Sequence, residues 1–169
     1  MILDTLKYIA DKVANVAKSL EEYCDPDAVV LDMDRSLQLD RYSCGVQSAY
    51  MILRYYGKAR SISNVERLLG TDEDGTTETS ILRLFRQRGL SVLVRPRARL
   101  KDIYHAIDEY GGPMLTYLKD NEHWSVVYGY SADKIYVLDP SLYSARLCGW
   151  DKSYFKSRWG RWGAIAYRK

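Results

Sequence analysis

The sequence predicts an α+β protein, in which helices from the N-terminal part of the chain pack on a mostly antiparallel sheet. Apolar positions recur every three or four places through most of the chain as far as Tyr110, and this spacing is helical. Further along the chain the pattern alternates residue by residue, as it does in half-buried strands. Helices and strands are thus segregated along the chain, which is typical of α+β folds.

Five helices are expected. The first covers residues 2–20 and places its apolar residues on one face of an amphipathic helix: Ile2, Leu3, Leu6, Ile9, Val13, Val16 and Leu20. Such a stripe usually contacts a core or a partner, and the mixed charge of the opposite face argues against a membrane anchor. The other four helices end at or beside a glycine and cover residues 44–56, 62–69, 78–88 and 100–110.

The expected strands are short. An extended segment at 29–33 lies between the first and second helices, and the strands themselves cover residues 91–95, 114–118, 124–130, 134–138, 145–148 and 164–168. The acidic turn at 72–75 is expected to cap the helix at 78–88. Calcium binding there is not expected, because an EF-hand loop would need an acid where Gly70 stands.

Composition excludes several classes of protein. The 169 residues suit one domain, and a hydrophobic fraction of 47% is enough for a core. Three cysteines, Cys24, Cys44 and Cys148, are too few and too uneven for a disulfide-built fold. No apolar run approaches the roughly 18 residues of a membrane span, and charges interrupt the N-terminal apolar pattern where a signal peptide would have its core. We therefore expect a reducing, cytoplasmic setting.

Nucleic acid is not an expected partner, because a net charge of +3 is small. Basic residues do alternate with tryptophans in the C-terminal segment 142–169, where they could stack on bases. The same residues fit a packed terminal strand equally well. A second basic run at 83–101 could favour acidic peptides, or could simply be a solvated surface.

Cys44 is the candidate nucleophile. It lies where a loop enters a predicted helix, and the partial positive charge and free N–H groups of a helix N-terminus favour a thiolate. The same N–H groups could hold an oxyanion, with the amide of Gln38 as a second donor, and Gly45 is expected to leave room for a substrate backbone. The alternative is a small buried cysteine that packs the helix start. This segment alone leaves both interpretations open.

His123 is the candidate base. If the strands at 124–130 and 134–138 form a hairpin centred on residue 131, His123 lies directly opposite Asp139. Their even separation keeps both side chains on one face even if the pairing slips by two. Asp139 could then accept a hydrogen bond from one imidazole nitrogen and leave the other for Cys44, although the pair could also simply close a strand end. His105 is expected on a helix, at the surface or in the core.

Several segments together resemble the bacteriocin-processing, double-glycine leader peptidases of the papain-like cysteine peptidase superfamily. The resemblance covers residues 33–141 and rests on Gln38 to Gly45, Leu53 to Gly57, Gly70 to Thr76, His123 to Val127 and Tyr136 to Pro140. It implies a papain-like fold, Cys44 as nucleophile, His123 as general base, Asp139 as its orienting acid and Gln38 as oxyanion donor. No cofactor or metal is implied, and no short Cys/His ligand spacing indicates one.

The resemblance implies hydrolysis of a peptide or isopeptide bond through an acyl-enzyme. Because the chain has neither a membrane span nor a P-loop, we expect a stand-alone peptidase, with residues 1–169 as one domain. Within it, 1–25 is an amphipathic helix and 142–169 an aromatic-basic segment outside the resemblance. Three roles stay open for that helix: packing on the domain, pairing with a partner, or covering the cleft. The alternatives to a peptidase are a non-cleaving peptide-binding module and a glutamine deamidase or acyltransferase.

Overall fold

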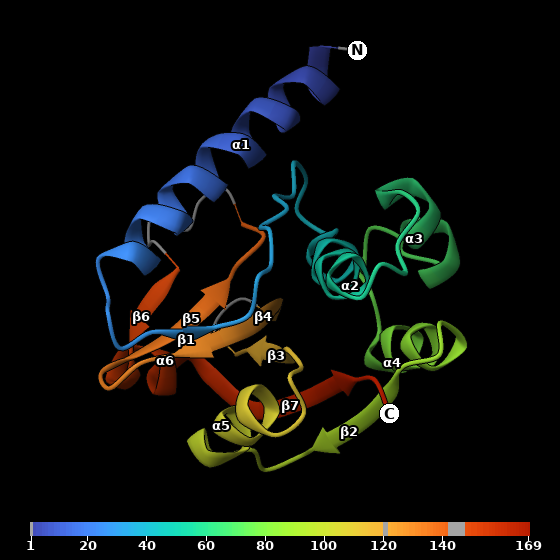
Figure 1. Cartoon of the computed structure of the whole chain (residues 1–169). Coiled ribbons are helices and arrows are strands. Elements are labelled where there is room, and N and C mark those ends of the chain that lie inside the picture. The colour runs from blue at the N-terminus through green and yellow to red at the C-terminus, as the bar shows by residue number, and fades with distance from the viewer. Residues whose placement is uncertain (1, 120–121, 142–147) are drawn as a thin grey trace.

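The computed structural model describes residues 2–119, 122–141 and 148–169 (Figure 1). Its elements are, in chain order, α1 (Ile2–Tyr23), β1 (Val29–Val30), α2 (Cys44–Tyr55), α3 (Ile62–Leu69), α4 (Glu78–Gln87), β2 (Ser91–Arg95), α5 (Leu100–Asp108), β3 (Met114–Leu118), β4 (His123–Tyr130), β5 (Lys134–Leu138), β6 (Gly149–Asp151), α6 (Lys152–Arg158) and β7 (Trp159–Tyr167). The five helices expected from the sequence are confirmed. α6 was not predicted.

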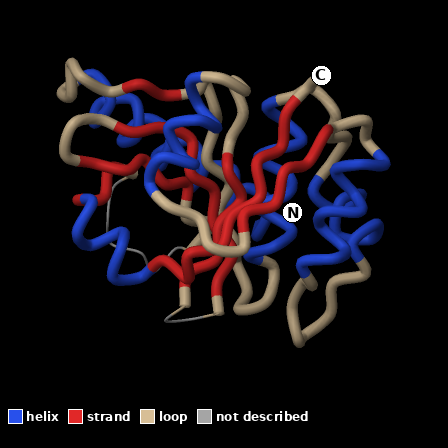
Figure 2. The backbone as a smooth tube through the Cα atoms, turned by 90° about the horizontal axis from the view of Figure 1, so that it is seen from below, coloured by secondary structure: helices blue, strands red, loops and turns tan. Residues whose placement is uncertain are grey.

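The described strands form one antiparallel sheet with helices on both sides (Figure 2). Its order is β2-β7-β3-β4-β5-β6, and β1 pairs with β4. Alternate residues face opposite sides: Leu115 and Val126 pack with α2, α3 and α4, whereas Met114 and Val127 pack with α5 and α6. The predicted α+β class is therefore confirmed.

The helix termini follow local chemistry. The Ser61 hydroxyl accepts a hydrogen bond from the Asn64 backbone at the start of α3, and Gly70 ends that helix in the left-handed conformation. Thr77 caps α4 in the same way. The prediction that residues 72–75 cap α4 was therefore wrong, because Thr77 does so and the acidic turn is a separate loop.

The hairpin of β4 and β5 has a different register from the one expected. Val127 lies opposite Val137, and Gly129 opposite Tyr136, so one extra residue is accommodated in β4 between those pairs. A hairpin centred on residue 131 would instead pair Val127 with Ile135, so the predicted register was wrong, and Asp139 is not directly opposite His123. Gly129 is required at this irregularity, because a Cβ there would lie 2.6 Å from the Val29 carbonyl oxygen of β1.

The C-terminal segment belongs to the core. β7 lies between β2 and β3, and the side chains of Trp150 and Trp159 are buried. Two of the tryptophans that could have stacked on bases therefore pack inside the protein, and Trp162 packs partly buried against the core. Of the strand expected at 145–148, residues 145–147 lie outside the described ranges, and β6 begins one residue after Cys148.

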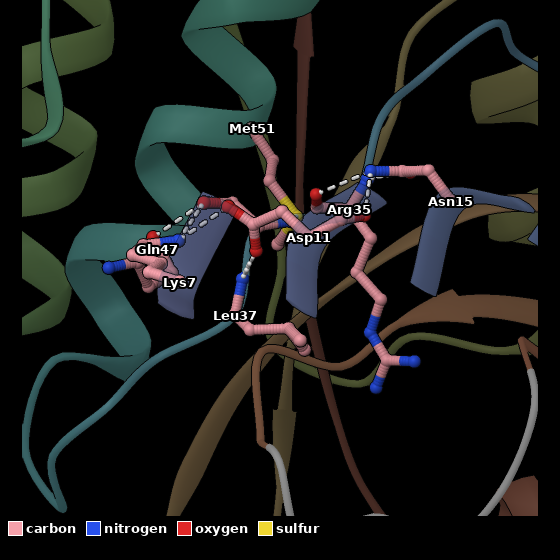
Figure 3. Close-up of polar contacts among 8 residues, drawn as sticks. Lys7, Asp11, Asn15, Arg35, Leu37, Gln47 and Met51 are labelled. Atoms are coloured by element: carbon pink, nitrogen blue, oxygen red, sulfur yellow. Dashed lines mark hydrogen bonds and ion pairs between the residues drawn. The ribbon is translucent and has the colours of Figure 1, made fainter. Parts of the chain in front are cut away.

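The apolar stripe of helix α1 does not contact the core, so that interpretation of the stripe was wrong. All seven apolar residues of the stripe are exposed, and the polar face points toward the body. The Asp11 carboxylate accepts a hydrogen bond from the Leu37 backbone N–H, at 2.8 Å, while the Asn15 side chain exchanges two hydrogen bonds with the backbone of Arg35 (Figure 3). The Lys7 ammonium donates to the Ser36 hydroxyl at 3.2 Å. Residues 35–37 are thus fixed from one side by α1.

None of the helices in the described ranges combines the length and the hydropathy that a membrane-crossing helix needs.

Candidate active site

Cys44 is the first residue of α2, as expected, and only 7% of it is exposed. The preceding residue, Ser43, makes no side-chain capping hydrogen bond, and its hydroxyl has no partner among the described residues. The carboxylate of Asp40 instead accepts from the backbone N–H groups of Tyr42 and Ser43, at 2.9 and 2.7 Å. The first N–H groups of α2 are therefore not capped by Ser43, and they carry the positive end of the helix dipole.

His123 and Asp139 are bonded directly. The Nε2 atom of His123 lies 2.6 Å from Oδ1 of Asp139, and both side chains are buried. Burial lowers the pKa of His123, but hydrogen bonds and charge from Asp139 and Cys44 outweigh it and raise the pKa from 6.5 to about 9. Since Nε2 is used by Asp139, the nitrogen left for Cys44 is Nδ1. The structure therefore brings Cys44, His123 and Asp139 together.

Asp139 is held as a carboxylate by its neighbours. Burial raises its pKa, but the hydrogen bond and charge of His123, the Ser141 backbone N–H and the charge of Arg35 outweigh burial, so the pKa lies below its usual 3.8. Arg35 is buried and donates from Nε to the Asp139 carbonyl oxygen at 2.7 Å. Arg35 was not among the residues predicted from the sequence; the available signal was an isolated arginine among the acids of residues 32–40.

Gln38 is buried and bonded to Pro140, the residue that follows this acid. Its backbone N–H donates to the Pro140 carbonyl at 2.8 Å, and its side-chain amide donates to the Asp40 carbonyl at 2.8 Å. Asp40 in turn holds the loop that leads into Cys44. Gln38 thus connects the loop of the acid to the loop of the cysteine, and its Oε1 atom has no partner among the described residues.

Gly45 has a different role from the one expected. A Cβ at this position would lie 2.6 Å from Cβ of Thr76 and 3.0 Å from Cδ1 of Trp124. The space beside Gly45 is therefore filled by the protein and is not open to a substrate backbone. Trp124 also donates from Nε1 to the Thr76 carbonyl at 2.9 Å, so α2, β4 and the loop before α4 meet at this glycine.

A cleft of about 250 Å³ opens beside Cys44. Tyr117 and Trp124 line it on the sheet side, and the remaining lining residues are mostly polar. The acids on its wall are Glu73, Asp74, Glu78 and Glu122. Arg41 is the one basic residue of the described lining, so the cleft is acidic, and the basic run at 83–101 is not part of it.

The other cysteines and the second histidine lie elsewhere. Cys148 is buried, and burial raises its pKa to about 11, which keeps it a thiol. Cys24 is exposed at the end of α1. His105 is exposed and pairs with Glu109 at 3.2 Å. Within residues 2–119, 122–141 and 148–169, no three His, Cys, Asp or Glu side chains are arranged to hold a metal ion.

Helices packed on an antiparallel sheet, with a cysteine at a helix start beside a histidine, define the class of papain-like cysteine peptidases. The chain belongs to the peptidase C39 family, whose model matches residues 33–166. The match extends past residue 141, where the resemblance in the sequence ended, and includes β6, α6 and most of β7. The resemblance stated from the sequence is confirmed, and the protein is a cysteine peptidase.

Known relatives agree with this assignment. The Lactococcin-G-processing and transport ATP-binding protein LagD of Lactococcus lactis is 30% identical over 107 residues, 62% of this chain and 15% of LagD. The chain therefore spans only a small part of this relative. A double glycine motif protease from an AMS/PCAT transporter, solved with its leader peptide, superposes with a TM-score of 0.70 at 19% identity and covers 83% of this chain and 94% of its own. The peptidase domain of Streptococcus ComA superposes with a TM-score of 0.67 at 23% identity and covers 79% of this chain and 96% of its own.

Proposed function

We propose that Cys44, His123 and Asp139 form the catalytic triad of this peptidase, and that they hydrolyse a peptide or isopeptide bond through an acyl-enzyme. The observation that carries the proposal is the 2.6 Å contact of His123 Nε2 with Asp139. The hydrogen bond and charge of Cys44, which also raise the pKa of His123, support it. A histidine with a pKa of about 9 stays protonated near neutral pH and can hold its partner as a thiolate. Residues 1–169 act as one peptidase domain in this proposal.

The reaction follows from these positions. The Cys44 thiolate attacks the carbonyl carbon, and the carbonyl oxygen becomes an oxyanion. As the C–N bond breaks, the His123 imidazolium gives its proton to the leaving amine, and a thioester to Cys44 remains. Neutral His123 then takes a proton from water, and the resulting hydroxide attacks the thioester. The C–S bond breaks, the acid product leaves, and the thiolate–imidazolium pair is restored.

Two sets of donors face the developing oxyanion in this proposal. The first is the group of uncapped N–H groups at the start of α2, beginning with Cys44 itself. The second is the side-chain amide of Gln38, of which one hydrogen is used by the Asp40 carbonyl and one is left. Donors of this kind stabilise the transition state more than the ground state, because they meet a full charge only there.

The substrate in this proposal is a peptide that carries positive charge near the scissile bond. The acidic lining of the cleft beside Cys44 supports the charge. The double glycine motif of the structural relative supports peptides with paired glycines as the first substrates to test. The transport named for LagD is not part of the proposal.

The test combines alkylation with turnover. Iodoacetamide should modify Cys44 near neutral pH faster than it modifies the exposed Cys24 of the same chain, with both followed by peptide mapping. Cys44→Ala should abolish cleavage of double-glycine peptides, whereas Cys24→Ala should leave it unchanged. Cleavage that survives Cys44→Ala would contradict the proposal. Binding without cleavage would instead indicate a peptide-binding module, and a gain of one mass unit at glutamine would indicate a deamidase.

A further inference from the structure

Helix α1 carries a continuous apolar seam on its outer face. Ile2, Leu6, Ile9, Val13, Val16, Leu20 and Tyr23 follow one another at intervals of four and three residues without a break. Each of them is more than half exposed, from 52% for Ile9 to 89% for Tyr23. Among the described residues, Val29 and Leu39 are the large apolar side chains outside α1 with comparable exposure. The exposed apolar surface of the protein is therefore concentrated on one helix.

The spacing of the seam specifies a helical partner. A strict alternation of four and three is the repeat of a coiled coil, in which two apolar positions per seven residues meet an equivalent stripe. A helix that packs on a sheet or lies on a bilayer uses a broader apolar face. At 22 residues, α1 holds three full repeats.

The helix cannot bury this seam by turning over. Its polar face is bound to residues 35–37 through Lys7, Asp11 and Asn15 (Figure 3). Lys18 on the same face is buried and pairs with Glu22 at 2.8 Å. The N-terminal end of α1 also extends away from the rest of the chain, so the outer face is accessible along its length (Figure 1).

The charges of α1 favour a second copy of the same helix over a lipid surface. Six residues flank the seam, and only Lys12 among them is charged: Leu3, Thr5, Ala10, Lys12, Ala17 and Ser19. In a parallel pair each Lys12 lies beside Ala17 of the other copy, so no like charges meet. Binding to anionic lipid would require an excess of basic residues, but α1 has three lysines against four acids.

The area is also sufficient. At roughly 100 Å² for an apolar side chain of this size, the seven residues of the seam would bury about 1,400 Å² in total between two copies. Stable protein interfaces bury about 1,200–2,000 Å². We propose that this protein self-associates through α1, with the seam of one copy packed against the seam of a second copy as a short coiled coil.

The test is the mass of the full chain in solution, measured by light scattering and by sedimentation across a dilution series. One chain has a mass of 19.5 kDa, and we expect twice that mass, or a higher multiple, at high concentration. Ile9→Glu should shift the protein to the mass of a single chain, because it buries a carboxylate in the seam. The matched control is Tyr8→Glu, the same substitution one residue away at a position that is 62% exposed and outside the seam, and it should leave the mass unchanged.

A second variant, Val16→Glu, guards against a folding defect, and far-UV circular dichroism of all three variants should match the parent chain. A parent protein with the mass of a single chain throughout the dilution series would overturn the proposal. So would association that Ile9→Glu and Tyr8→Glu weaken equally, or association that appears only when vesicles are added.

Discussion

The carboxylate of Asp139 reaches Nε2 of His123 diagonally across two strands. Continuing the observed pairing of Val126 with Leu138 would place Asp139 opposite Ser125, two residues from His123. Near the turn the pairing is displaced by one residue, with Tyr130 opposite Ile135. Had that displacement persisted, the two side chains would point to opposite faces. The irregularity between Val127 and Gly129 therefore puts the acid and the histidine on one face.

Asp139→Asn should lower kcat by on the order of 10²–10⁴, because the amide can neither hold the imidazolium nor fix the same tautomer. The pKa of His123 should fall from about 9, so activity should be lost at a lower pH than in the parent. Profiles of kcat against pH and a histidine titration by NMR measure both effects. Asp108→Asn, which changes an acid bonded to Tyr130, serves as the control and should leave the profile unchanged.

The free energy of unfolding should fall at alkaline pH because His123 loses its proton beside Asp139. A folded-state pKa above the unfolded 6.5 means that the stabilisation by His123 is complete below 6.5 and is lost as the pH rises to about 9. The whole contribution is about 3 kcal/mol. Urea unfolding at several pH values should show this loss in the parent and not in His123→Gln. If the free energy of unfolding fell equally with pH in the two proteins, the raised pKa of His123 would be contradicted.

Arg35 is expected to position Asp139. Arg35→Lys keeps the charge but loses the Nε donor to the Asp139 carbonyl, so kcat should fall roughly tenfold while KM stays unchanged. The alkaline limit of the pH profile should also move, which a purely structural role would not cause. Arg54→Lys is the matched control, since Arg54 is about half exposed and pairs with Asp34 at the surface. A parallel rise in KM would argue for a substrate contact instead.

Gly45→Ala should destabilise the fold by about 1–3 kcal/mol, because the new methyl group would overlap Thr76 and press on Trp124. Thr76→Gly in the same chain should recover part of the loss. A double-mutant cycle of unfolding free energies measures the coupling between the two positions. Purely additive effects would show that the packing around Gly45 is not what requires a glycine.

Peptides with lysine near the scissile bond should be cleaved more efficiently than the same peptides with glutamate, by roughly three- to tenfold at low salt. The difference should shrink as salt is added, since the acids of the cleft are exposed. Glu73→Lys together with Asp74→Lys should reverse the preference in kcat/KM. Asp133→Lys, at the β4–β5 turn and so at the opposite end of β4 from His123, should not.

The limits of several helices and strands could be predicted from the residues within and beside them. Helical spacing and a stop at Gly70 were sufficient to place α3 to the residue. The same holds for β2, β3 and β5, where alternation and flanking turns set the limits. α6 was missed because its seven residues follow β6 directly and interrupt an aromatic-basic pattern that resembles a strand.

The sequence by itself determined which few side chains could act: one cysteine at a helix start, one histidine and one acid at an even separation. Only the tertiary structure decided that the histidine and the acid meet, because their shared face depends on an irregularity in β4. The structure also showed the hydrogen bond to the Asp139 carbonyl from Arg35, which lies 104 residues away in the chain. It likewise decided which face of α1 points outward. Amphipathic spacing shows that a helix has two faces. The polar face packs on the body because the Asp11 carboxylate accepts from the Leu37 backbone and Asn15 exchanges hydrogen bonds with the Arg35 backbone.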